Sequence, residues 1–246
     1  MQMRNAILLL LIVSTVSCSP KYVTPGSDVK ISELADADIS KLLANKPAAE
    51  FPVNIAVVRL QSPSYTNHRY SNRYNPQPEP QDKFSMILTR DAEEEEAFNK
   101  LAQMEGVKQA SPFNRLLLPY TYNSIKDLRL AAAKMKAQML LVYTFDTQFF
   151  VDTKNYGPQN VIALGYLKNK EVKAVTTASV ALFDVQTEYL YGLAEATATQ
   201  KKRANAWKKL DEVDNLRIDT EKKSFNQLIG EIEKMWKGVM QEYAKK

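Results

Sequence analysis

The chain has one cysteine, one histidine and only seven glycines among its 246 residues. A single cysteine cannot form a disulfide within the chain, so the hydrophobic core alone must hold the fold together. The lone histidine, His68, cannot supply the histidine pairs of common zinc and acid-base sites, and the sequence has no nucleophile elbow and no phosphate-binding glycine loop. These absences favour a non-catalytic protein, and we expect no metal site and no cofactor.

The net charge of the chain bears on whether nucleic acid is a partner. The chain carries 33 basic and 28 acidic side chains, which gives a net charge of +5. A mild positive charge gives no strong case for nucleic acid, although it is compatible with weak attraction to anionic lipid or glycan. We therefore expect no nucleic acid partner. The length suits one medium-sized domain with extensions.

The position of the cysteine is the most informative feature present. Cys18 directly follows Thr15-Val16-Ser17, which are preceded by the apolar run from Ala6 to Val13 and by Arg4. A basic residue, an apolar segment and small residues occur in this order in secretory signal peptides. The arrangement resembles the lipobox of bacterial lipoproteins, except that threonine stands where leucine is usual. The resemblance implies that residues 1–17 are a lipoprotein signal peptide.

Lipidation of Cys18, with palmitate among the acyl groups, would anchor the protein stably, because two membrane signals already suffice. Ser19, rather than aspartate, follows the cysteine, which in such lipoproteins favours the outer membrane. We expect a lipid-anchored, periplasm-facing outer-membrane protein with a tether at 18–28. Two alternatives stay open: a secretory signal with an incidental cysteine, and a spanning anchor, for which the apolar run is shorter than the roughly 20 residues needed.

Residues 29–246 are predicted to form a single globular domain. In its first half we expect a helix at 29–43, a buried strand at 51–60, a helix at 84–106, a short strand at 113–119, a helix opened by Ser124 and a strand at 139–150. In its second half we expect a strand at 161–167, a hairpin at 172–200 that turns at 186–188, a charged helix at 201–216 and an amphipathic helix at 225–243. The predicted fold class is α/β (α+β): a mixed β-sheet flanked by helices, with an antiparallel hairpin and a long C-terminal amphipathic helix.

An insertion at 61–83 interrupts this pattern with tyrosine, asparagine, arginine, serine and proline. Compact domains rarely contain so long a loop unless it is functional or disordered, and both interpretations stay open. Interleaved aromatic and guanidinium groups can stack on sugars or pair with phosphate and carboxylate groups. The candidate partner-binding residues are Tyr65, Arg69, Tyr70, Arg73 and Tyr74.

Two segments carry a resemblance to known families. Residues 128–143 resemble the element of helix, small residue, polar residue and apolar strand found in lipoproteins related to the curli secretion channel, in outer-membrane activators of penicillin-binding proteins and in the amino-terminal domain of TolB. Residues 180–191 resemble a hairpin of the same families, with Glu188 where glycine is usual, and Ala137-Gln138 stands in place of the usual Gly-Ala-Asp. The resemblance implies the fold and an envelope setting, and these families have no catalytic residue to carry over.

The leading hypothesis is a non-catalytic cell-envelope lipoprotein that binds or scaffolds another envelope component, a protein or a glycan, through the insertion or a sheet edge. One alternative is an oligomeric assembly or export accessory lipoprotein that forms homo-oligomers. The segment 149–178 is expected to be too interrupted by polar residues, glycine and proline to supply the long hairpin of a pore. Another alternative is a carboxylate-dependent glycan hydrolase that uses Asp146, Asp152 or Asp184.

Overall fold

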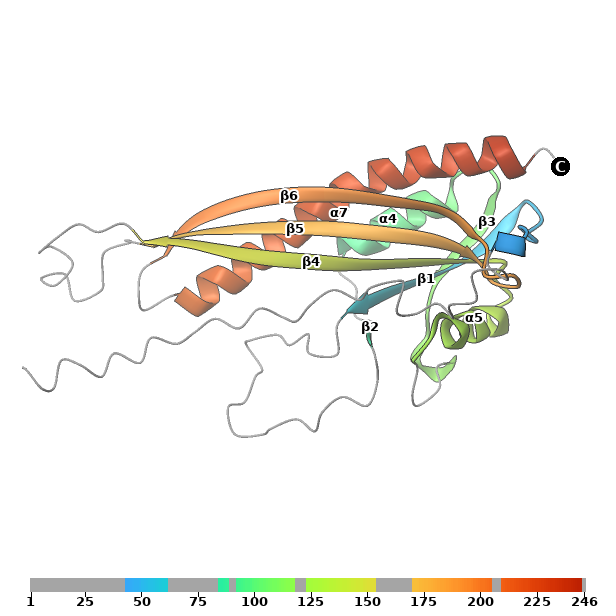
Figure 1. The fold of residues 1–246 in the computed structure, drawn as a ribbon, viewed down its shortest axis with the longest axis horizontal. Helices are drawn as coiled ribbons and strands as arrows, with labels where there is room; N and C mark the ends of the chain where they lie inside the picture. Colours follow the sequence, from blue (N-terminus) through green and yellow to red (C-terminus); the bar gives the residue numbers. More distant parts are fainter. Residues whose placement is uncertain are drawn as a thin grey trace, which may run out of the picture.

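The computed structural model describes residues 43–61, 84–88, 92–117, 123–153, 170–204 and 209–244 (Figure 1). Its strands are β1 (Val53–Gln61), β2 (Ser85–Ile87), β3 (Val107–Pro112), β4 (Met139–Thr153), β5 (Lys170–Asp184) and β6 (Leu190–Ala204). Its helices are α4 (Ala92–Ala102), α5 (Ile125–Lys134) and α7 (Lys209–Tyr243), with a 3-10 turn, η1, at Arg115–Leu117. The predicted α+β fold, with its mixed sheet, hairpin and long C-terminal helix, is confirmed.

The six strands form one sheet in the order β2-β1-β4-β5-β6, and β3 also pairs with β1. Strand β1 is parallel to β3 and β4, whereas β4, β5 and β6 are antiparallel to one another. Pairing of β1 with β4 ends at Arg59 and Tyr143, but β4 continues to Thr153. The parts of β4, β5 and β6 beyond this point, residues 144–153, 170–179 and 195–204, extend away from the rest of the sheet as a three-stranded arm (Figure 1).

Helix α7 covers one face of β5 and β6, including the arm, and α4 packs on the same face of the sheet beside β3. In the arm, Val213 and Leu216 of α7 pack against β5 at Val172 and Ala174. Nearer the other end, the buried α7 residues are Phe225, Leu228, Ile232, Trp236 and Val239, which share a core cluster with β4 and β5. Burying each large apolar side chain contributes roughly 1.5–3 kcal/mol, so this long interface is the main source of stability for the arm.

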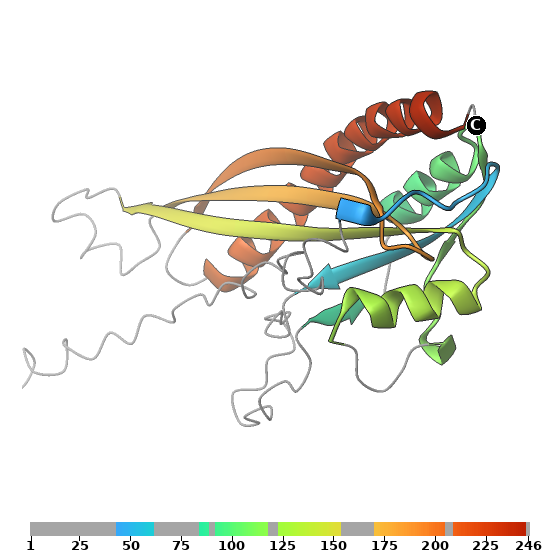
Figure 2. The same cartoon turned by 45° about the vertical axis from the view of Figure 1, so that its right-hand side comes forward.

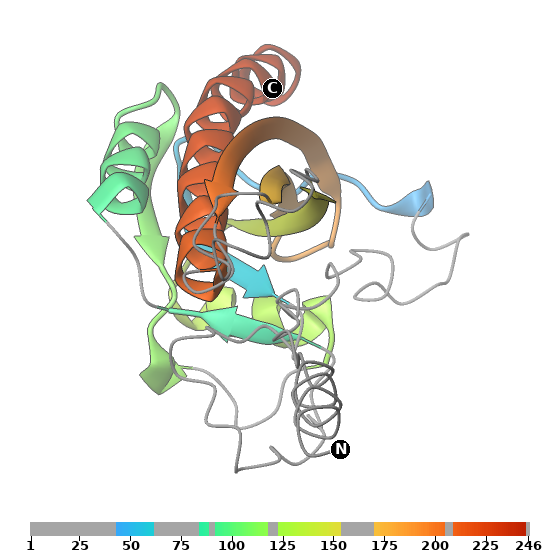
Figure 3. The same ribbon diagram turned by 90° about the vertical axis from the view of Figure 1, so that its left-hand side faces the viewer.

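The opposite face is covered only at one end (Figure 2). Ile125 and Leu128 of α5 pack with Leu140 and Val142 of β4 and with Phe183 of β5 in a second buried cluster. Because α5 stops there, no described helix or strand covers the opposite face of the arm. The molecule therefore has three layers at one end and two layers along the arm (Figure 1). Viewed along the long axis, α7 lies against β6 (Figure 3).

Two expectations in the first half of the domain are wrong. Residues 84–106 do not form one helix, because 85–87 pair with β1 as β2 and the helix α4 begins only at Ala92. The strand expected at 113–119 lies earlier, at 107–112, and is followed by η1. The segment Val107–Pro112 has few apolar residues, and its strand conformation follows from parallel pairing with β1, which local sequence does not reveal.

Two expectations in the second half are also wrong. Residues 201–204 are not helical but complete β6, and α7 then runs without interruption from Lys209 to Tyr243. The segment 149–178 was expected to be too interrupted for a long hairpin, yet β4 and β5 pair as far as Thr153 and Lys170. By contrast, the strands expected at 51–60 and 139–150, the helix after Ser124 and the hairpin turn at 186–188 are confirmed.

Candidate partner-binding surface

All six predicted site residues lie outside the described residues: Cys18, Tyr65, Arg69, Tyr70, Arg73 and Tyr74. The tether at 18–28, the strand expected at 161–167 and most of the helix expected at 29–43 also lie outside them. The two ends of the 61–83 insertion are described, since Gln61 pairs with Ser85 across β1 and β2 and Phe84 is completely buried. The insertion therefore leaves and rejoins the sheet at neighbouring, well-packed positions.

A network of buried charges lies close to these ends. Arg59 of β1 reaches Glu94 of α4 at 3.4 Å and Glu221 of α7 at 3.5 Å, and its guanidinium group lies 4.5 Å from the ring centre of Phe145. The hydroxyl of Tyr143 donates to Glu94 at 2.9 Å. These contacts tie α4 and α7 to the two central strands.

Arg217 continues the network along α7. It pairs with Asp214 at 3.0 Å and with Glu221 at 2.7 Å, and only 3% of its side chain is exposed. Buried pairs of this kind contribute little net stability when intact but are costly to break, because removal of one partner leaves an uncompensated charge. Each charged side chain of the network lies beside one of opposite charge, so we interpret the network as fixing the position of α7.

One edge of the sheet is formed by β6, a candidate for the contact surface expected at a sheet edge. Among the residues that the structure describes, β6 is terminal in the sheet order and pairs only with β5, through residues Leu190 to Ala204. At about 3.4 Å per residue, a strand of 15 residues is about 50 Å long. Alternate residues of an edge strand direct their N–H and C=O groups away from the sheet, where another chain can pair with them.

The α7-facing side of β6 consists of small residues, Gly192, Ala194, Ala196 and Ala198, followed by Gln200. These residues pair in register with the β5 residues whose side chains pack beneath α7, so they lie on the same face of the sheet. Gly192 leaves no room for a side chain, because a Cβ atom there would lie 2.8 Å from Cγ of Met235. Small side chains thus allow α7 to approach β6 closely at its beginning.

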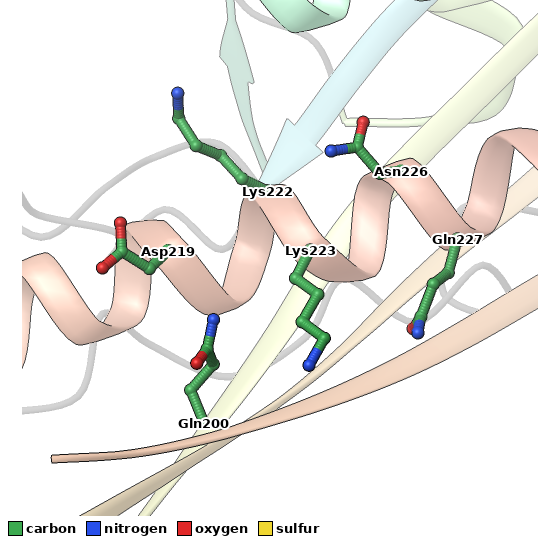
Figure 4. A pocket seen from close by; sticks show the side chains of 6 residues that line it. All are labelled: Gln200, Asp219, Lys222, Lys223, Asn226 and Gln227. Carbon is green, nitrogen blue, oxygen red and sulfur yellow. The ribbon is translucent and has the colours of Figure 1, made fainter.

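Towards the end of β6, small side chains give way to a shallow, open groove of about 500 Å³, lined by Gln200, Asp219, Lys222, Lys223, Asn226 and Gln227. All six side chains are polar or charged, but most of the surface that they expose in the groove is apolar. We call this space the β6–α7 groove. Figure 4 shows that Lys223 and Gln227 extend from α7 towards β6, and that Gln200 extends from β6 towards α7. Lys222 extends away from β6 and reaches Glu93 of α4 at 3.1 Å. The groove is therefore bordered by one edge strand and one helix.

The opposite face of the arm, which we call the uncovered face, is also polar. Two side-chain hydrogen bonds join β5 to β6 on this face. The hydroxyls of Thr177 and Thr197 lie 2.9 Å apart, and the hydroxyl of Ser179 donates to Glu195 at 2.9 Å. At the end of the arm, Glu171 lies 3.5 Å from Lys201 and 3.9 Å from Arg203. Both faces beside the free edge therefore offer hydrogen-bonding and charged groups.

Asp184 has a structural role at the hairpin turn. Its Oδ1 accepts from the backbone N–H groups of Gln186 and Thr187 at 2.8 and 2.9 Å. Its Oδ2 accepts from Ala48 at 2.8 Å, from Ala49 at 2.9 Å and from the Tyr191 hydroxyl at 2.9 Å. Burial opposes ionisation of Asp184, but these hydrogen bonds outweigh burial and lower its pKa. Burial and the bond to Asp184 raise the pKa of Tyr191.

The expected hydrolase carboxylates are not brought together. Asp184 pairs in register with Met139, whereas Asp146 lies seven residues further along β4, which is about 23 Å at the strand rise. Asp152 lies further still along the same strand, opposite Glu171. Catalytic carboxylates of glycosidases lie within roughly 10 Å of each other, so neither Asp146 nor Asp152 can form such a pair with Asp184.

The described residues also contain no group of three or more histidine, cysteine, aspartate or glutamate side chains placed to hold a metal ion. Within the same ranges, no helix combines the length and the apolarity that crossing a bilayer requires.

The β6–α7 groove was not among the predicted sites. Its residues are individually ordinary polar side chains, and the charged segment at 201–216 suggested a helix instead of the end of an edge strand. One signal was present, namely the alternation of Gly192, Ala194, Ala196 and Ala198. Small residues at every second position of a strand indicate that another element lies close to that face.

Comparisons with known proteins give only distant similarity. No family model matches the chain, and no curated protein matches it. Among solved structures, the PelC dodecamer from Paraburkholderia phytofirmans is 13% identical, with 72% of this chain and 90% of that chain covered and a TM-score of 0.24. A putative neuraminyllactose-binding hemagglutinin homolog from Helicobacter pylori is 10% identical, with 82% and 95% covered and a TM-score of 0.32. A DUF330 protein from Xanthomonas campestris is 10% identical, with 88% and 96% covered and a TM-score of 0.27. Scores this low carry no argument about function.

Proposed function

We propose that this chain is a lipid-anchored protein of the bacterial cell envelope that binds another envelope component without catalysing a reaction. The observation that carries the proposal is the placement of the only cysteine, Cys18, directly after small residues and an apolar run. Ser19 supports an outer-membrane location facing the periplasm. The long free edge of β6 supports binding, because it offers a row of backbone groups beside two polar faces.

The anchor is tested by replacing the cysteine. We expect the Cys18→Ala variant to fold normally, to incorporate no radiolabelled palmitate and to leave the membrane fraction of fractionated cells. The wild type should incorporate the label and sediment with outer membrane. A wild-type protein without label, together with a variant that still sediments with the membrane, would remove the lipoprotein interpretation.

Binding is tested by crosslinking in intact cells. A photoreactive amino acid at Thr199, which is exposed on β6, should capture one defined envelope component. The matched control carries the same group at Leu130, which is 55% exposed on α5. Equal capture at both positions, or at neither, would show that the β6 side of the molecule is not a binding surface.

A second candidate function is an oligomeric accessory role in assembly or export. The arm favours it, because β6 has a free edge on one side and β4 passes beyond its pairing with β1 on the other. A second copy could extend the sheet at either edge. Light scattering of the detergent-solubilised protein decides between a monomer, which the binding role predicts, and a closed oligomer.

A further inference from the structure

The inference rests on the proposed binding function and names the chemistry of the partner. We propose that an extended, acidic polypeptide segment of another protein adds to the outer edge of β6 and lies in the β6–α7 groove. The groove supplies two elements that strand addition requires: an edge strand with outward backbone groups, and pockets or walls beside it for alternate side chains.

In the described residues, β6 pairs on one side only, with β5, from Leu190 to Ala204. An added strand would complete the hydrogen bonds of this edge, and its side chains would alternate between the two faces. Every second side chain would then enter the groove beside Gln200, Lys223 and Gln227, and the others would lie along the uncovered face (Figure 4).

The charges beside the outer edge of β6 favour an acidic segment. Strand β6 contains one acid, Glu195, and three adjacent bases, Lys201, Lys202 and Arg203, near its end. Lys202 lies on the α7 side of β6, opposite Val172, and Lys223 borders the same side from the helix. Only one acid, Asp219, lines the groove. The positive charges therefore flank the open edge from both faces of the arm.

The cations of the uncovered face remain accessible. Lys201 and Arg203 are 59% and 57% exposed, and both lie near the same carboxylate, that of Glu171, at 3.5 and 3.9 Å. One carboxylate cannot neutralise two cations, so an incoming acidic side chain gains attraction there. Basic residues on an edge strand also oppose pairing with chains of like charge. A second copy of β6 would bring the same excess of positive charge, which favours a foreign acidic strand over self-pairing.

The test uses the full-length protein in detergent and short synthetic probes. The first probe is a capped peptide of about ten residues that alternates threonine and glutamate, and the second alternates threonine and lysine. By fluorescence anisotropy at low salt, we expect the acidic peptide to bind at least about 10-fold more tightly than the basic one. Binding should weaken when NaCl is raised from about 0.05 to about 0.3 M, because exposed charges are screened.

A third probe separates strand addition from general attraction. It has the acidic sequence with N-methyl groups on alternate backbone nitrogens, placed in either of the two registers. One register should lose binding, because N-methylation blocks the ladder hydrogen bonds while charge is unchanged. In hydrogen exchange, the unmodified acidic peptide should protect amides of β6 and leave those of β1 unaffected. Equal binding of all acidic peptides would overturn strand addition.

A pair of charge-reversal variants locates the site. We expect Lys223→Glu to weaken the acidic peptide by about 5- to 10-fold. The matched control, Lys237→Glu, reverses an exposed charge on the same helix 14 residues away, about 21 Å along the axis, and should leave binding within about 2-fold. Equal losses in both variants would mean that overall charge, not the groove, attracts the peptide, and would overturn the proposal.

Other results would reject either this proposal or the proposed function, and they can be told apart. If β6 amides become protected in the absence of peptide as protein concentration rises, and the mass doubles, a second copy occupies the edge and the proposal is wrong. If the peptide experiments fail but Cys18 is labelled and Thr199 captures a partner, only the acidic strand is rejected. Failure of the labelling and crosslinking experiments would reject the proposed function, because the peptide measurements use purified protein and do not depend on the cell.

Discussion

Gly192 of β6 and Met235 of α7 lie so close that a Cβ atom on the glycine would be 2.8 Å from Cγ and 2.9 Å from Sδ of the methionine. This contact sets how closely α7 approaches the first part of β6. The helix and the strand separate enough further along for the groove to open at Gln200. The same pair of elements therefore forms a tight contact at one end and an open groove at the other.

We predict that Gly192→Val destabilises the domain by about 1–3 kcal/mol, because the added side chain must displace Met235 within a packed interface. Urea unfolding measures the change. Met235→Ala in the same background should restore part of the loss, since it removes the atoms that clash. Gly238→Ala is the control: its added Cβ meets nothing within 4 Å, and in a helix it should stabilise by about 0.5–1 kcal/mol. A neutral Gly192→Val would contradict the tight contact.

We predict that Asp184→Asn lowers stability by about 1–3 kcal/mol at neutral pH. One oxygen becomes an NH2 group, which faces the N–H donors of either Gln186 and Thr187 or Ala48 and Ala49. Because the folded-state pKa of Asp184 lies below its ordinary value of 3.8, the stabilisation is present above that pH and is lost as pH falls through the lowered pKa. Unfolding measured at several pH values should show the difference between wild type and variant shrinking in acid. A difference that stays constant into acid would argue against this role.

We predict that Arg217→Ala destabilises the domain by about 3–5 kcal/mol, because it leaves the carboxylates of Asp214 and Glu221 buried without this partner. The control is Lys234→Ala, which breaks an exposed pair with Glu231 at the same three-residue spacing as Arg217 and Asp214. Its cost should be under about 1 kcal/mol. Thermal unfolding separates the two, and similar losses in both variants would contradict the structural role of the network.

Local signals explain which elements the sequence predicts correctly. Ser124 and Asp127 form a complete capping box at the start of α5, with the Ser124 side chain accepting from Asp127 N–H. The apolar run after Met139 and the turn residues before Leu190 likewise act within a few residues of themselves. Local residue type does not reveal two turn conformations, because Lys136 and Glu188 adopt φ values of 60° and 64°, in the left-handed region that favours glycine. Glu188 also pairs with Arg129.

Pairing between distant segments explains what the sequence does not predict. Whether Lys201 to Arg203 belong to a helix or a strand depends on β5, in particular on Glu171, about 30 residues earlier. The order of strands likewise decides that β6 is an edge, and no property of β6 alone reveals it. A binding groove that forms between an edge strand and a helix therefore cannot be located before both elements are placed.

We predict that Leu141→Ala costs about 2–5 kcal/mol, because Leu141 is buried in the cluster beneath α7 and its truncation leaves a cavity. Leu193→Ala is the matched control on the neighbouring β6 strand. Leu193 is 58% exposed on the sheet face opposite α7, so its truncation should change stability by no more than about 0.5 kcal/mol. Urea unfolding of both variants tests the assignment of the two faces. A loss under about 0.5 kcal/mol for Leu141→Ala would show that the sheet is misplaced.

The last prediction concerns the insertion at 61–83. Its ends are joined by the pairing of Gln61 with Ser85 and by the buried ring of Phe84, so the connection can be shortened without separating them. We expect replacement of residues 63–82 by a few glycines and serines to leave the melting temperature nearly unchanged, because closure entropy depends only weakly on loop length.

Capture of the partner by the crosslinker at Thr199 should then decide which surface binds. If the insertion contributes through Arg69 and Arg73, the shortened protein and the Arg69→Ala, Arg73→Ala double variant should both lose capture, and salt should weaken the wild type. If capture is unchanged in both, binding depends on β6 and α7 without the insertion.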